Sequence, residues 1–229
     1  MNISSMKKLL VVPLLAALSL SCTSETTSIQ LLGAIAFPFG PDEVDDCSPD
    51  GEVQQLGGSL DVAPLGAGGY SIAFNFRSSL GESGEGTVGG NPVGNPGNND
   101  FILQEVRLSY SSEPALNIPE ERLPLYGVFP AGSDDDSFIG VNLVGPAALA
   151  ALRGQALPAN GLTLLVTLQL AGELGSGRDI ESNEATFPIT VFNSGLTACP
   201  AGLVPVPSGP CNAAGGQDGA PICGVPPEA

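Results

Sequence analysis

Alternation of apolar and polar residues is the feature that most limits what this chain can fold into. From Tyr70 to Arg77 every second residue is apolar, with Ser, Ala, Asn and Arg between them. The segment from Phe101 to Tyr110 repeats this pattern, with Gln104 as the exception. Its expected buried face contains Ile102, Val106, Leu108 and Tyr110. Side chains in a strand point alternately to the two faces of a sheet, so both segments predict strands with one buried face.

Further segments rich in Val, Ile, Thr and Phe predict additional strands. They span residues 29–39, 60–62, 138–144, 162–170 and 185–192. One segment, 146–154, predicts a helix of about two turns, because Pro opens it, good helix formers follow and Gly ends it. Its buried face would contain Leu149 and Leu152. This pattern predicts an all-β fold, an antiparallel β-sandwich with one short helix and an immunoglobulin-like topology as the leading candidate.

Two segments predict irregular structure. Ser78 to Asp100 is rich in Gly and Asn and poor in apolar residues, so we expect a mobile hairpin loop there. Residues 200–229 form a Pro/Gly-rich tail without helical or strand periodicity. Four cysteines, Cys47, Cys199, Cys211 and Cys223, could form disulfides in three ways. We expect Cys211 to pair with Cys223 inside the tail and Cys47 to pair with Cys199.

The N-terminus has the pattern of an export signal. Lys7 and Lys8 precede a run of twelve predominantly apolar residues, Leu9 to Leu20. The run is shorter than the roughly 20 residues that a membrane-spanning helix needs, but it suits the apolar core of a signal peptide. Ser21 and Cys22 follow it. We therefore divide the chain into a signal peptide (1–21), a tether (22–28), a β-sandwich domain (29–199) and the tail (200–229).

Residues 6–22 resemble the signal of bacterial lipoproteins, in which a Leu-rich stretch ends in a small residue and a cysteine. The resemblance implies that Cys22 becomes the acylated N-terminus and anchors the protein to a membrane. Thr23 in the place of Asp implies onward sorting to the outer membrane. Ser19 and Ser21 also fit ordinary signal peptidase, which would cut the same bond and leave Cys22 free or paired. With Cys22 acylated, the remaining four cysteines can all pair, as an oxidising compartment favours.

Charge and residue types exclude several functions. Every acidic residue follows Cys22, so the exported chain has five arginines against 24 carboxylates, a formal charge of −19. Such a chain repels nucleic acid, whose phosphates bind chiefly Lys and Arg. The chain has no His, and both of its lysines lie in the signal. Ser-His-Asp triads, Cys-His pairs, lysine Schiff bases and His-ligated metal sites are therefore excluded from the exported part.

Carboxylates carry the remaining chemistry. Asp134, Asp135 and Asp136 precede an expected strand and could offer oxygen ligands to Ca²⁺, with solvated turn acids as the simpler interpretation. A pair of carboxylates could hydrolyse a glycan, but such a site would need an aromatic platform beside two facing acids. We expect an exported, non-enzymatic binding or structural module that contacts an envelope protein. A Ca²⁺ or small-ligand carrier and a glycan hydrolase are the alternatives.

Overall fold

The computed structural model describes residues 27–36, 54–63, 65, 68–81, 86–88, 91–93, 99–133, 137–158, 160–206, 216–219 and 222–225. Strands dominate this part of the chain, together with the helix α2 (Pro146–Arg153). The longer strands are β1 (Ile29–Ile35), β2 (Gly58–Asp61), β3 (Ser71–Ser78), β6 (Phe101–Ser112), β7 (Glu121–Phe129), β8 (Ser137–Asn142), β9 (Leu162–Leu174) and β11 (Ala185–Phe192). Within the described ranges no helix is long and apolar enough to cross a membrane.

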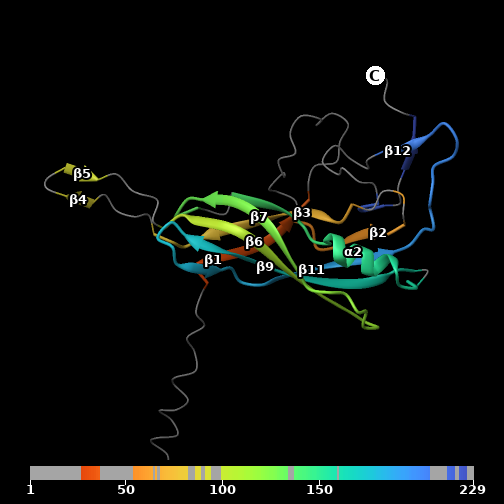
Figure 1. Cartoon of the computed structure of the whole chain (residues 1–229), viewed down its shortest axis with the longest axis horizontal. Coiled ribbons are helices and arrows are strands. Elements are labelled where there is room, and N and C mark those ends of the chain that lie inside the picture. Colours follow the sequence, from red (N-terminus) through yellow and green to blue (C-terminus); the bar gives the residue numbers. More distant parts are fainter. Residues whose placement is uncertain are drawn as a thin grey trace, which may run out of the picture.

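Two sheets form the body of the molecule (Figure 1). One has the strand order β1-β3-β8, and the other has the order β2-β11-β9-β6-β7, with β10 (Asp179–Glu181) beside β9. These orders correspond to immunoglobulin strands A-B-E and G-F-C-C′, with β2 added beside the position of G. All pairs in the two sheets are antiparallel except β2 and β11, which run parallel. The predicted all-β sandwich is confirmed.

The core lies between the two sheets and contains the alternating apolar residues of both. Tyr70, Ile72, Phe74 and Phe76 are all buried, as the alternation predicted. Aromatic rings cross the interface: the Phe74 ring meets Phe187 of β11 edge-on, and the Phe76 ring centroid lies 4.3 Å from that of Phe129 on β7. Burial of such apolar area is the main favourable term in folding, and these ring contacts fix how the sheets face each other.

A β-bulge corrects one predicted face. The buried residues at the start of β6 are Phe101 and Leu103, whereas Ile102 is only partly buried. The register of β6 with both neighbours shifts between Leu103 and Glu105. A bulge inserts one residue and reverses which positions face the core. Gln104, the exception in the alternation, therefore marks this irregularity, and the prediction that Ile102 belongs to the core face was wrong.

Strand β7 was missed by the sequence analysis. Pro124 interrupts its pattern, and proline inside a strand argues against a central position. The structure places β7 at the edge of its sheet, where the missing backbone N–H need not donate to a neighbour.

Part of the expected loop 78–100 also has strand structure. A small separate ribbon joins β4 (Gly86–Val88) to β5 (Asn91–Val93).

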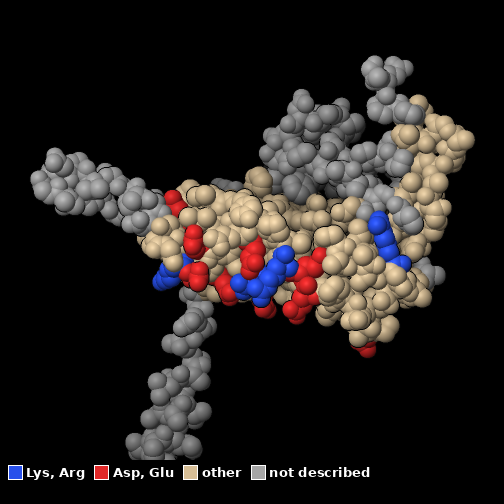
Figure 2. All heavy atoms as spheres, viewed as in Figure 1, with Lys and Arg blue, Asp and Glu red and all other residues tan. Residues whose placement is uncertain are grey.

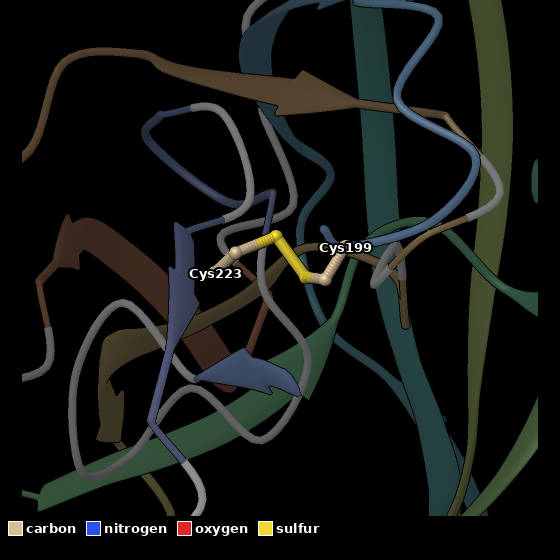
Figure 3. Close-up of a disulfide and its surroundings, with 2 residues drawn as sticks. All are labelled: Cys199 and Cys223. Atoms are coloured by element: carbon tan, nitrogen blue, oxygen red, sulfur yellow. A yellow bond between two sulfur atoms is a disulfide. The ribbon is translucent and has the colours of Figure 1, made fainter. Parts of the chain in front are cut away.

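The C-terminal tail contains structure that the sequence analysis did not predict. Strands β12 (Val204–Val206) and β13 (Ile222–Gly224) pair antiparallel, and Cys199 is joined to Cys223 (Figure 3). Both predicted disulfide pairings were wrong, because each required a cysteine that this bond uses. The β12–β13 pairing brings residue 223 back toward the segment that leaves β11, which the sequence spacing could not reveal. Cys47 and Cys211 lie outside the described residues.

Candidate binding face on the six-stranded sheet

The outer face of the six-stranded sheet carries rows of polar side chains that cross its strands. Arg107 on β6 lies directly opposite Arg122 on β7 and opposite Gln169 on β9. In the next row the hydroxyl oxygens of Thr167 on β9 and Thr186 on β11 are 2.9 Å apart. Figure 2 shows arginine and acidic side chains gathered side by side on this part of the surface. The face combines charge and hydrogen-bonding groups over several strands.

A small ion-pair network lies at the centre of this face. The Nε atom of Arg107 is 2.7 Å from Glu105 Oε1, and the same guanidinium also pairs with Glu181 on β10. Hydrogen bonds from Arg107 to Glu105 and then to Glu181 raise the pKa of the arginine above its ordinary value. Glu105 also lies 4.0 Å from Arg122, which has an exposed side chain. Two opposed guanidiniums would repel each other, so the carboxylate between them offsets a like-charge contact.

A half-open hollow of about 440 Å³ lies beside this network. Its lining residues are Arg107, Leu108, Ser109, Glu120, Glu121, Arg122, Thr167, Leu168, Gln169 and Glu184. Glu120 and Glu184 reach it from different parts of the chain. Both residues are exposed, and in the described part neither carboxylate has an ion pair or hydrogen bond. The hollow therefore has two free carboxylates at its border, whereas Glu105 and Glu181 are already paired with arginine.

Exposed apolar side chains continue the face along the edge strand. Tyr126 and Val128 of β7 are 81% and 65% exposed, which is unusual for such residues. They share the outward side of β7 with Arg122, because residues of a strand alternate between its two sides. The ring of Tyr126 can supply contact area at a low entropy cost, since few torsions must be fixed. Exposed apolar and charged side chains thus share one side of the edge strand.

Glu121 lines the hollow but has a structural role. Its carboxylate accepts hydrogen bonds from the backbone N–H groups of Ala147 and Ala148, at 2.9 and 3.1 Å, and from the hydroxyl of Tyr110 at 2.9 Å. The residue at the helix N-cap, Gly145, provides no side-chain cap for α2. Glu121 therefore caps the helix from a neighbouring strand, where a negative charge also matches the helix dipole.

Two further carboxylates hold the structure together near β2. Asp61 is buried, and its Oδ1 accepts hydrogen bonds from the N–H groups of Ala63 and Ser194, while its Oδ2 has no hydrogen-bond partner among the described residues. Asp218 receives a hydrogen bond from the hydroxyl of Tyr70 and another from the N–H of Ser59. These groups satisfy backbone and side-chain donors, which buried polar groups require.

The residues that the sequence analysis singled out are only partly placed. Cys22, Cys47, Cys211 and Asp134 to Asp136 lie outside the described residues, and the metal interpretation of the three acids stays a prediction. In the described ranges no group of three or more His, Cys, Asp and Glu side chains could hold a metal ion. The face around Arg107, Arg122 and Tyr126 could not be predicted without β7, whose strand pattern Pro124 interrupts.

Comparisons of the chain with protein-family models, with curated proteins and with solved structures each found no match. The described residues therefore define this protein by its fold, a β-sandwich with the capped helix α2 and a disulfide-linked C-terminal segment.

Proposed function

We propose that this chain is an exported, lipid-anchored envelope protein that serves as a non-enzymatic binding module and contacts a partner protein through the outer face of the six-stranded sheet. The observation that carries the proposal is that exposed Tyr126 and Val128 lie on the same outward side of β7 as Arg122, which lines the charged hollow. Tyrosine and arginine dominate the energetics of many protein interfaces, and polar groups commonly surround such anchors. The opposite sheet presents Phe138 as its exposed aromatic residue among those described.

A glycan hydrolase is less well supported by the same surface. Glu120 and Glu184 both line the hollow, but they precede β7 and β11, between which β6 and β9 lie. Three strand spacings are about 14 Å, whereas two catalytic carboxylates lie about 5–10 Å apart. The third carboxylate there, Glu121, is engaged by the helix N-terminus and Tyr110. No aromatic residue is among the described residues that line the hollow, so a sugar ring would have no stacking platform.

A carrier of a small ligand or of Ca²⁺ would need an enclosed pocket or a clustered oxygen site. The hollow beside the Arg107 network has a volume of about 440 Å³, and a second hollow of about 320 Å³ is lined by residues such as Gln104, Glu105 and Asp179. Both are half open and have mixed polar and apolar walls. Specific small-ligand sites bury most of the ligand surface. We therefore favour a macromolecular partner over an enclosed ligand for this face.

The anchor is part of the proposal and sets the distance of the face from the membrane. The tether 22–28 has seven residues before β1 begins at Ile29. A fully extended chain of that length spans at most about 25 Å. An acylated Cys22 would therefore keep the sandwich close to the bilayer, in reach of other proteins of the same membrane. Several acyl chains would make this attachment stable, since each buried CH₂ contributes about 0.8 kcal/mol.

Two experiments test the two halves of the proposal. A Cys22→Ala variant is expected to leave the membrane fraction, and mass spectrometry of the natural protein is expected to show an acylated Cys22. Retention of Met1 in that product would refute the export signal. For the face, a photoreactive amino acid replaces Tyr126 in one variant and Phe138 in a control. A crosslinked partner that forms from position 126 and not from 138 supports the face. Equal crosslinking from both positions would contradict it.

A further inference from the structure

We infer that the partner of this face is a basic polypeptide segment, whose Lys or Arg side chains would contact the free carboxylates of Glu120 and Glu184 and the ring of Tyr126. This inference rests on the proposed function and specifies the chemistry of the partner. Some charged side chains of the face are paired with each other, whereas others have no partner among the described residues, and the inference follows from this difference.

The paired charges of the face are internally satisfied. Arg107 is held by both Glu105 and Glu181, and Glu105 also lies near Arg122. Two guanidiniums therefore face two carboxylates, and this network is close to neutral. It holds Arg107 of β6 between Glu105 and Glu181 of β10, while Arg122 of β7 lies at its exposed border. A partner does not need to compensate these groups.

The unpaired charges are negative and lie on the border of the hollow. Glu120 and Glu184 have no partner in the part of the chain that the structure describes. The floor between them offers the hydroxyl oxygens of Ser109 and Thr167 and the amide of Gln169. These oxygens can accept hydrogen bonds from an ammonium or a guanidinium group, which have several donors and no acceptor. Together with the two carboxylates, these acceptor oxygens match a cationic side chain, although the Thr167 hydroxyl is also bonded to Thr186.

The apolar neighbours extend the match to a polypeptide. Tyr126 and Val128 lie on the same side of β7 as Arg122, about 13 and 20 Å farther along the strand, so a segment several residues long that starts in the hollow can reach the exposed ring. A guanidinium over the face of a tyrosine ring is attracted by the ring quadrupole. A simple cation would not use these groups, whereas a chain with basic and apolar side chains would use both.

The charge of the whole chain favours the same partner over other occupants. The exported chain has a formal charge of −19, which repels anionic lipid and nucleic acid. A second copy of the chain would carry the same excess of negative charge. Edge-to-edge pairing of two β7 strands is also opposed by Pro124 and by the irregular register next to it. A basic segment is attracted at long range and satisfies the unpaired groups at contact.

The test measures binding of fluorescent nona-arginine to the full exported chain by anisotropy at low salt. The double variant Glu120→Gln and Glu184→Gln is expected to bind about fivefold more weakly, since exposed ion pairs are individually modest. Tyr126→Leu is expected to weaken binding about twofold through loss of the ring contact. A charge-matched control, Glu113→Gln with Glu228→Gln, changes two acids of which neither is among the described lining residues of the hollow. It is expected to have a much smaller effect.

Each outcome decides the inference. Equal losses in the double variant and in its control would show attraction by net charge alone and would overturn the basic-partner assignment. If the protein bound nona-glutamate and Arg122→Gln abolished this binding, the face would recognise an acidic segment, and the basic-partner assignment would be overturned. Both results are separate from a failure of the proposed function, because position-dependent crosslinking at 126 would still establish the face. Melting curves of all variants verify that each is folded.

Discussion

Buried Tyr70 and partly buried Tyr110 each donate a hydrogen bond to a carboxylate, but the two contacts differ in how far apart the bonded residues lie in the sequence. Tyr110 on β6 bonds to Glu121 at the start of β7, eleven residues away in sequence. Tyr70 bonds to Asp218, which is 148 residues away and belongs to the C-terminal segment. The first contact forms between neighbouring strands and also caps α2. The second depends on a distant piece of chain being held in place.

Both contacts need space that only glycine provides. A Cβ atom on Gly145 would lie 2.6 Å from the carboxylate oxygens of Glu121, and one on Gly58 would lie 1.8 Å from the hydroxyl of Tyr70. The second contact is further supported by Gln217, whose side-chain amide bonds to both the N–H and the C=O of Ser71, as a neighbouring strand would. The C-terminal segment thus works as a short added strand between β2 and β3.

The two contacts thus depend on different parts of the chain. The Tyr110–Glu121 contact is part of the sandwich itself, and its loss would affect the helix. We expect the Tyr70–Asp218 contact to depend on the Cys199–Cys223 bond, because Cys223 links the segment that carries Asp218 to the end of β11, and its loss to affect β2 and β3. The following variants separate the two.

Removal of the disulfide is expected to have the largest effect. In Cys199→Ser/Cys223→Ser the chain loses a cross-link with a sequence separation of 24, which the chain-entropy model values at about 3.5 kcal/mol of unfolding free energy. The C-terminal segment should then detach locally, and hydrogen exchange of the amides of Ser59, Asp61 and Ser71 should accelerate, because they bond to residues 216–218. The amides of α2 should keep their protection. Unchanged exchange at Ser59 would show that the segment stays bound without the cross-link.

Substitution of the helix-capping carboxylate should have a somewhat smaller effect at the other contact. Glu121→Ala removes the acceptor of two backbone N–H groups and of the Tyr110 hydroxyl, and we expect a loss of about 2–3 kcal/mol. Hydrogen exchange should rise in α2 and stay unchanged at Ser59. Glu120→Ala is the matched control, since this exposed neighbour should cost less than about 0.5 kcal/mol. Similar urea midpoints for the two variants would contradict the capping role.

Alkaline unfolding should report both contacts together. Burial is the main cause that raises the pKa of Tyr70 and of Tyr110 above the ordinary value, and the carboxylates of Asp218 and Glu121 raise it further. The native protein therefore retains these protons while the unfolded chain loses them above about pH 10, so stability falls as the pH rises. Each tyrosine should contribute a slope of about 1.4 kcal/mol per pH unit. The exported chain has no lysine to obscure this range.

The two phenylalanine variants divide this slope between the contacts. Tyr70→Phe and Tyr110→Phe should each remove about half of the decrease in unfolding free energy between pH 10 and 11.5, measured by urea denaturation. Tyr126→Phe is the control, because this exposed ring has no such partner among the described residues. A slope that survives both substitutions would mean that other groups control the alkaline transition.

The same comparison shows which parts of the structure the sequence could predict. Local periodicity predicted β3, β9, β11 and the buried face of α2, because alternation and helical spacing are properties of adjacent residues. It failed where a long-range contact decides the outcome. Pro124 concealed an edge strand, and nothing near Gln217 indicates that its amide completes the edge of β3. The binding face was missed for the same reason, since Arg107 and Arg122 meet only through the pairing of β6 with β7.

The charge of Asp218 should have the smallest effect. Asp218→Asn keeps an acceptor oxygen for Tyr70 and Ser59, and Asn tolerates the left-handed backbone conformation of this residue (φ 53°). The side chain is exposed, so we expect a loss of less than about 1 kcal/mol. The pKa of Tyr70 should decrease but stay above its ordinary value, because burial is the larger cause. Absorbance titration of the tyrosines measures this shift. A return of Tyr70 to ordinary titration would show that the segment opens when the charge is removed, and that Asp218 rather than the disulfide holds it closed.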